Sequence, residues 1–346
     1  MLVTQEPMLR RFWHCLFPLS ELEEDKPRAF RLLGEDIVVW KDADGVPHAV
    51  QDRCPHRTAK LSLGTVKNGE VVCPYHGWAF DGAGKCTLIP QEVTPREKAV
   101  YMRAYHCEAR YGQVWVCLDE PALGIPEIEP YGKPGIRQVF EFSEDWKCSP
   151  LRIMENEFDA AHLSFIHATS FGSTDPIPAL PAIEELDDGF IARSTPQVRN
   201  PEGMRAALHM TEDKTVRTTT GRYYVPFFRV TEIAYPNGLK NILVTALTPI
   251  DDNTTRFNQF VLRNDTEEEV PSEEVIAFDR RVTLEDKLVL ESTDPAVPLD
   301  NREGFEVHMA SDRPGLMMRR KVRAYCDRLR AEMLRDAPRP ALMAGE

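Results

Sequence analysis

The chain has 346 residues, of which 42% are hydrophobic and 28% charged, as in an ordinary globular protein with about two domains. Its net charge of −13 argues against a protein that binds nucleic acid or an anionic membrane through charge alone. No apolar run approaches the roughly 18–20 residues that span a bilayer, and the N-terminal residues lack the cleavage site of a signal peptide.

The eight cysteines are scattered and do not form a disulfide framework, which favours a reducing compartment, the cytoplasm. Short β-rich runs separated by turn signals begin near Ala29 and end near Leu118. They comprise Phe30–Leu33, Ile37–Trp40, Val46–Val50 and residues 111–118. We therefore expect an all-β domain over residues 28–120, preceded by an N-terminal segment, residues 1–27, that packs on the domain that follows.

Two loops of this β-domain each carry one cysteine and one histidine: Cys54 with His56, and Cys73 with His76. Two metal sites fit this set, a structural zinc site and a [2Fe-2S] cluster with cysteines on one iron and histidines on the other. Zinc sites usually take two cysteines from one turn and two histidines from a later helix. Here each loop supplies one residue of each kind, as two facing loops around two irons require, so the cluster is favoured.

A Pro- and Gly-rich stretch, residues 121–135, separates this domain from a second one, residues 121–346 with the linker included. Strand patterns with polar turns recur from about residue 185 to 265. They are followed by a helical pattern over Ser272–Leu290 and a basic helix over about Gly315–Leu334. The whole is an α+β protein whose second domain is an antiparallel sheet with packed helices.

The second domain carries a second candidate metal centre. Asn156, Asp159 and His162 are spaced to lie along one helical stripe, and His167 follows His162 by five residues. In a regular α-helix His167 would lie about 140° from His162, too far around to share a metal. The helix must therefore widen or end between them. Two imidazoles and one carboxylate form the ligand set of non-haem Fe(II) oxygenases.

The third ligand has to come from a distant carboxylate. On the helix over residues 272–290, an apolar stripe combines Val275, Phe278, Val282 and Val289, and Asp286 lies roughly 40° from Val282 at its edge. A carboxylate that faces a core must be paired or bind a metal. Asp279 and Glu285 lie farther from the stripe and can reach solvent more readily, so we predict Asp286 as the ligand and Glu285 as its main rival.

Residues 54–78 resemble the signature of the Rieske non-haem iron oxygenases, and Asp159, His162 and His167 resemble that family's Asp-x-x-His-x4-His element. The resemblance implies a Rieske domain followed by a helix-grip, START-like catalytic domain. It implies a [2Fe-2S] cluster on Cys54, His56, Cys73 and His76, and a mononuclear Fe(II) on His162, His167 and Asp286. The similarity is to the phthalate-dioxygenase-like branch, which includes methylxanthine N-demethylases and guanidinium-alkaloid hydroxylases.

This resemblance also implies the activity, which is oxidation of a small organic substrate with O2. We expect monooxygenation, as C–H hydroxylation or N- or O-demethylation; ring cis-dihydroxylation and a non-catalytic electron carrier are the alternatives. Because the chain has no Gly-x-Gly-x-x-Gly motif, NAD(P)H must act through a separate reductase, possibly with a ferredoxin.

The resemblance further gives Asp159 a role as an electron bridge from His76 of one subunit to His162 of its neighbour in a head-to-tail homotrimer. A simpler role for Asp159 is to fix the tautomer of His162, and the two are compatible. Asn156 is predicted to contact the metal ligands without binding the metal itself.

Overall fold

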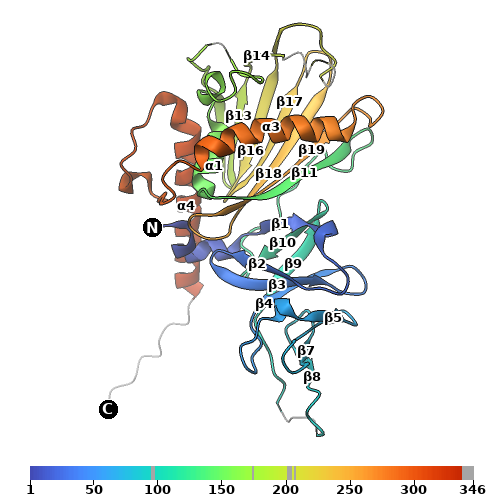
Figure 1. Ribbon diagram of the computed structural model, residues 1–346. Helices are drawn as coiled ribbons and strands as arrows, with labels where there is room; N and C mark the ends of the chain where they lie inside the picture. Colours follow the sequence, from blue (N-terminus) through green and yellow to red (C-terminus); the bar gives the residue numbers. More distant parts are fainter. Residues whose placement is uncertain (95–97, 174, 201–204, 206–207, 337–346) are drawn as a thin grey trace, which may run out of the picture.

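The computed structural model describes residues 1–94, 98–173, 175–200, 205 and 208–336. Two parts lie one above the other in Figure 1: an upper part with one large sheet and most of the helices, and a lower part with two smaller sheets. None of the helices in these ranges is both long and apolar enough to cross a membrane.

The lower part contains the strands predicted for residues 28–120. Its larger sheet is antiparallel with the order β1 (His14–Pro18), β10 (Gln113–Cys117), β9 (Ala104–Arg110), β4 (Pro47–Gln51), β3 (Glu35–Lys41) and β2 (Arg28–Leu32). Its smaller sheet has the order β5 (Thr65–Lys67), β6 (Glu70–Val72), β7 (Ala79–Phe80) and β8 (Cys86–Leu88). Asn68 and Gly69 both take positive φ, 53° and 80°, which is the tight hairpin turn that the Asn-Gly pair predicts.

The upper part is one antiparallel sheet of seven strands, which confirms the predicted α+β class. Its order is β11 (Arg137–Trp146), β19 (Thr255–Arg263), β18 (Lys240–Pro249), β17 (Phe228–Ala234), β16 (Thr218–Tyr224), β13 (Gly189–Ser194) and β12 (Ala182–Leu186). Two short strands, β14 (Gln197–Arg199) and β15 (Lys214–Val216), pair separately. Strand β11 was not predicted from the sequence, because the acidic residues Glu141, Glu144 and Asp145 obscure the alternation of apolar and polar residues. A bulge between Phe140 and Phe142 also interrupts this alternation.

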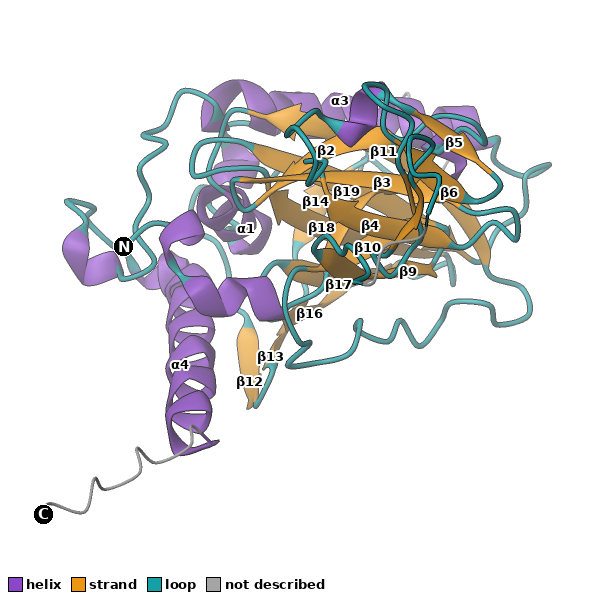
Figure 2. Ribbon diagram, turned by 90° about the horizontal axis from the view of Figure 1, so that it is seen from below, coloured by secondary structure: helices purple, strands orange, loops and turns teal. Residues whose placement is uncertain are grey.

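Helices α1, α3 and α4 accompany the large sheet. Helix α1 (Pro150–Phe158) begins at Ser149, whose side chain caps it, with Pro150 in the first turn. Helix α3 (Ser272–Leu290) lies along one face of the sheet (Figure 1), where Val275 packs with Val139 and Val261. Helix α4 (Arg313–Asp336) runs beside the sheet at the edge formed by β12 and β13, as Figure 2 shows.

One hydrophobic core joins the two parts. It includes Leu9 and Phe17 from the N-terminal segment, Trp146 and Phe257 from the large sheet, and Met318 from α4. The first eleven residues contact the upper part directly: Arg330 on α4 binds the Glu6 carboxylate at 2.7 Å, and Asp252 accepts hydrogen bonds from Thr4. The segment then continues into β1, which belongs to the lower sheet.

Candidate active site and metal centres

The two Cys/His loops face each other at the end of the lower part that is far from α1 and α3 (Figure 1). Each loop is a tight turn closed on its cysteine: the Thr58 N–H donates to the Cys54 carbonyl at 2.9 Å, and the Gly77 N–H donates to the Cys73 carbonyl at 3.0 Å. Both cysteines are buried, with 2% and 3% of their surface exposed. The turns thus present all four candidate ligands between two short loops.

The arrangement of the side chains in these loops distinguishes between the two kinds of metal site, zinc and [2Fe-2S], that the sequence allowed. The thiols of Cys54 and Cys73 lie within hydrogen-bonding reach of each other, and the rings of His56 and His76 lie 4.5 Å apart. A tetrahedral zinc ion would bring all four donor atoms within about 3.8 Å of one another. Among the described residues, three or more His, Cys, Asp or Glu donor atoms lie within 4.8 Å of one another only in the second domain, and not at these two loops. Paired cysteines opposite paired histidines fit a two-iron cluster.

The segment with the second set of candidates is less helical than predicted. Helix α1 ends at Phe158, and Asp159 has extended backbone angles, so Asn156, Asp159 and His162 do not share one helical stripe. A single 3-10 turn, His162–Ser164, follows. The prediction of a helix end was right in kind, but the end comes before His162. Asp159 explains the change, since its carboxylate accepts the N–H groups of Ala161 and His162 at 3.0 and 2.9 Å.

This irregular segment brings His162 and His167 together with Asp286 from α3. The donor atoms of these three side chains all lie within 4.8 Å of one another. Asp286 Oδ1 is 3.2 Å from His167 Nε2 and 3.7 Å from His162 Nε2. The structure therefore brings together the three residues that the sequence analysis grouped.

The chemistry of the three donors fits a divalent metal ion. Asp286 Oδ1 is buried and accepts no hydrogen bond, although two imidazole nitrogens point toward it. Ligands bound at right angles about 2.1 Å from one metal lie about 3 Å apart, close to the separations here. Two imidazoles and one carboxylate on one side of a metal leave its other positions open, as in non-haem iron oxygenases.

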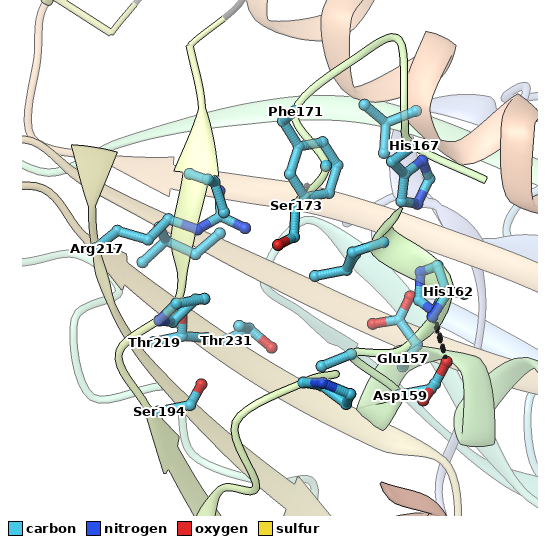
Figure 3. Close-up of a pocket in the computed structure, with 18 of the residues that line it drawn as sticks. Glu157, Asp159, His162, His167, Phe171, Ser173, Ser194, Arg217, Thr219 and Thr231 are labelled. Carbon is cyan, nitrogen blue, oxygen red and sulfur yellow. Dashed lines mark hydrogen bonds and ion pairs between the residues drawn. The ribbon is translucent and has the colours of Figure 1, made fainter. Parts of the chain in front are cut away.

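Carboxylates hold the outer nitrogens of both imidazoles. Asp159 Oδ2 lies 3.0 Å from His162 Nδ1, the contact drawn as a dashed line in Figure 3. Glu285 Oε2 accepts from His167 Nδ1 at 2.7 Å and from the Ser170 hydroxyl at 2.8 Å. Glu285 therefore contacts the Nδ1 side of His167 and lies outside the group of three converging donors, His162, His167 and Asp286. Carboxylates in this position fix the ring orientation and make the imidazole a stronger ligand.

The residues of α3 that are buried differ from those of the apolar stripe predicted from the sequence. Asp286 faces inward as expected, but Val289 is 43% exposed and does not belong to a buried stripe. Asp279, predicted to lie nearer solvent, is only 7% exposed. The stripe is a poor guide here because the sheet and the loop over residues 162–172 cover the helix unequally along its length.

A cavity of about 430 Å³ opens beside the three candidate ligands. In Figure 3, His162 and His167 lie on one side of the cavity, and Arg217, Thr219 and Thr231 lie on the opposite side. Its lining mixes apolar side chains with a few polar ones, as binding sites for small molecules do. Apolar lining residues include Phe158, Leu163, Phe171, Ile233, Leu243 and Val282.

Asn156 and Glu157, in the last turn of α1, also line this cavity. Glu157 forms a partly buried ion pair with Arg229 of β17, with Arg229 Nη1 2.9 Å from Glu157 Oε2. Asn156 thus lies next to the candidate metal site, while the Glu157–Arg229 pair was not found from the sequence. A signal was available, since a carboxylate next to Asn156 on a short helix needs a cationic partner if it is buried.

Two family models match the chain. The model of the Rieske [2Fe-2S] domain matches residues 12–105, and the model of the vanillate O-demethylase oxygenase C-terminal domain matches residues 146–328. The methylxanthine N1-demethylase NdmA of Pseudomonas putida is 32% identical over 91% of this chain and 88% of its own length. The methylxanthine N3-demethylase NdmB of the same organism is 29% identical over 92% and 90%.

Solved structures show the same fold. The structure of Pseudomonas putida NdmA with caffeine superposes with a TM-score of 0.80 and 29% identity, covering 95% of this chain and 94% of that one. Dicamba monooxygenase, at 22% identity and a TM-score of 0.79, shares the fold. The chain therefore belongs to the Rieske non-haem iron oxygenases, which combine a [2Fe-2S] cluster with a mononuclear non-haem iron and use O2.

Proposed function

We propose that this chain is a terminal oxygenase component that removes a methyl group from nitrogen or oxygen of a small organic substrate by monooxygenation. The observation that carries the proposal is the convergence of His162, His167 and Asp286 on the wall of a cavity large enough for a small organic molecule. The N-demethylase relatives that cover nine-tenths of the chain support the reaction type.

In this proposal His162, His167 and Asp286 hold the mononuclear iron, and Cys54, His56, Cys73 and His76 hold the Rieske cluster. When bound, the cluster supplies electrons singly, and the iron supplies the chemistry that activates O2. Hydroxylating a methyl group on nitrogen or oxygen gives a product that breaks down to formaldehyde. The reaction consumes O2, two electrons and two protons, and releases the demethylated substrate, formaldehyde and water.

The chain's own residues prepare the site for this reaction. Asp159 and Glu285 orient the two imidazoles through their Nδ1 atoms. Phe158 and Val282 line the cavity near the ligands and limit the access of water. The partly buried Glu157–Arg229 ion pair fixes the end of α1 beside the site.

Electrons reach the chain from NAD(P)H through a separate reductase, with or without a ferredoxin, as is general in this family. In Figure 1 the strands next to the cluster loops lie in the lower part, and α1 and α3 lie in the upper part. Transfer within one chain would have to pass from the lower part to the upper part, and a neighbouring subunit would offer a shorter route. We propose a head-to-tail homotrimer in which each cluster serves the iron site of the next subunit.

Asp159 is placed well for this transfer. Besides contacting His162, it lines a second cavity of about 440 Å³ that opens on the outer side of α1, together with Val307 and His308. Phe305 and Val307 in the adjoining loop are almost fully exposed, as an apolar docking surface requires. Asp159→Asn should keep both metals but stop electron delivery, and normal turnover of this variant with reductase would remove the bridging role.

The proposal includes a cytoplasmic location. None of the eight cysteines, all of which the structure describes, forms a disulfide. Absence of disulfides is what a reducing compartment produces.

A substrate screen tests the function. Methylated heteroaromatics, aromatic ethers and alkaloids are supplied with a generic reductase, and formaldehyde is measured alongside hydroxylated product. Wild type should release formaldehyde from one of these classes, and Asp286→Ala should release none. Incorporation of both atoms of ¹⁸O₂ into a ring diol would instead identify the cis-dihydroxylase alternative, which uses the same metals. A non-catalytic electron carrier would not need the cavity or the three donors that line it. Such a carrier would contain about two irons per chain, whereas the oxygenase would contain about three.

A further inference from the structure

Helix α3 carries the candidate ligand Asp286, so the contacts that hold this helix on the sheet bear on the metal site. An apolar contact holds its first turn against β11 and β19. Farther along, Glu144 of β11 forms ion pairs with Arg280 and Lys287 of α3. Both ion pairs are partly exposed, and exposed ion pairs contribute little to stability. The middle of the helix therefore needs another contact with the sheet.

That contact is a meeting of two buried carboxyl groups, Glu141 of β11 and Asp279 of α3, which lie within hydrogen-bonding reach of each other. Glu141 Oε2 accepts from the Gln259 amide at 2.7 Å. Glu141 Oε1 and Asp279 Oδ2 are also buried, and no N–H group or Ser, Thr or Tyr hydroxyl of the described residues donates to either. Ionised carboxylates can only accept hydrogen bonds, so these two groups can bond only if one of them carries a proton.

The surroundings of the pair favour one proton. Burial, and then the neighbouring Asp279, raise the pKa of Glu141 well above its ordinary value. Burial raises the pKa of Asp279 as well, whereas the hydrogen bond with Glu141 and the charges of Arg263 and Arg217 lower it. Arg263 is itself paired with Asp265, which balances its charge. A second negative charge on the pair would therefore be buried without a cation of its own.

We propose that Glu141 and Asp279 share one proton, and that the resulting hydrogen bond fixes α3 on β11 and so positions Asp286 at the iron site. The inference rests on the proposed iron ligands, but on neither the substrate nor the reaction. Asp279 and Asp286 are two helical turns apart, on nearly the same face and about 10.5 Å apart along the axis. If both carboxyl groups were ionised, their repulsion would push the middle of α3 from the sheet, and the continuous helix would carry the shift to Asp286.

Infrared spectroscopy of the full-length enzyme with both metals in place detects the proton directly, through the C=O band of a protonated carboxyl group at neutral pH. The band should be present in wild type and absent from Glu141→Gln and from Asp279→Asn. Glu274→Gln, an identical exchange at an exposed position of the same helix, is the matched control and should keep the band. Absence of the band from wild type, or its survival in either variant of the pair, would overturn the inference.

Fe(II) binding tests the positioning. In Glu141→Gln an amide N–H replaces the carboxyl O–H, so the bond to Asp279 no longer needs a proton, and Fe(II) affinity should equal that of wild type. Glu141→Ala leaves Asp279 buried alone and should bind Fe(II) about tenfold more weakly, the lower end of the range for groups that orient a metal ligand. The absorption of the Rieske cluster, which lies in the other domain, should change in neither. Equal Fe(II) affinities of the Ala and Gln variants would overturn the positioning role.

The pH dependence of iron retention gives a further test that does not depend on Glu141→Ala folding. The proton stays on the pair below its raised pKa and leaves as the pH rises through it, so repulsion appears on the alkaline side. Raising the pH until the infrared band disappears should release iron from wild type but not from Glu141→Gln. Retention of iron by wild type after loss of the band, or release from both proteins at the same pH, would contradict the proposal.

None of these measurements involves a substrate. An enzyme that released no formaldehyde from any substrate would count against demethylation and would still show the band and its link to iron binding. Absence of the shared proton would leave demethylation intact.

Discussion

Replacing Glu285 by Gln would remove the negative charge behind His167 with almost no change in size. In the wild type, one carboxylate oxygen accepts from both His167 Nδ1, at 2.7 Å, and the Ser170 hydroxyl, at 2.8 Å. A hydrogen bond to a charged acceptor is roughly twice as strong as a neutral one. Losing the partner behind a metal-binding histidine typically costs 10- to 100-fold in metal affinity, or about 1.4–2.7 kcal/mol.

We therefore expect Glu285→Gln to bind Fe(II) about 10- to 100-fold more weakly at the mononuclear site and to keep its Rieske cluster. The assay removes the mononuclear iron with a mild chelator, titrates Fe(II) back, and follows the cluster by its absorption spectrum. Ser170→Ala is the matched control, since it removes a hydrogen bond to the same oxygen but leaves the charge, and it should lose only a few-fold. Wild-type Fe(II) affinity in Glu285→Gln would refute the role given to this carboxylate.

Further predictions concern the metal site and the fold. Asp286→Ala should lose about one iron per chain and retain the sulfide of the cluster, measured by iron and sulfide analysis; three irons per chain would contradict its role. Gly172→Ala would place a Cβ 1.9 Å from the Leu163 carbonyl oxygen, so the loop must shift and both iron content and melting temperature should fall, whereas Ser173→Ala should change neither. Burial lowers the pKa of His14 from 6.5 to about 4, so the unfolded chain takes up this proton first and stability is lost as pH falls through that window. The loss reaches roughly 3 kcal/mol once the pH is below the folded-state pKa. His14→Gln should show a smaller loss between pH 7 and 4.5 in chemical denaturation, and an unchanged slope would contradict the assignment.

The ligand types and their local spacing could be predicted from sequence because short loops fix them. Cys54 and His56 are too close in the chain to separate, and the same holds for Cys73 and His76. Asp286 was predicted because a carboxylate at the edge of an apolar helical face needs a partner. The arrangement of the four cluster candidates as like pairs, thiol beside thiol and ring beside ring, depended on how the two loops face each other.

The errors have a common cause. Periodicity in a helix describes directions around its axis but does not say what lies along each direction. On α3 it placed Val289 in a buried stripe and Asp279 nearer solvent, and both were wrong. Helix α1 was extended past Phe158 because the spacing of Asp159 and His162 is helical, although the Asp159 carboxylate binds the backbone N–H groups that follow it and stops the helix.

The amino-acid sequence by itself determined the fold class, the family and the chemical nature of both metal sites, since these depend on residue types and on separations of a few residues. The sequence already indicated Asp286 as the partner of the two histidines, but only the tertiary structure decided the surroundings of the other two carboxylates, Glu285 at His167 Nδ1 and Asp279 at the far end of the cavity. The three lie on one helix. Their different surroundings arise from the way α3 packs across the sheet and the loop over residues 162–172, and contacts between such distant segments form only in the folded chain.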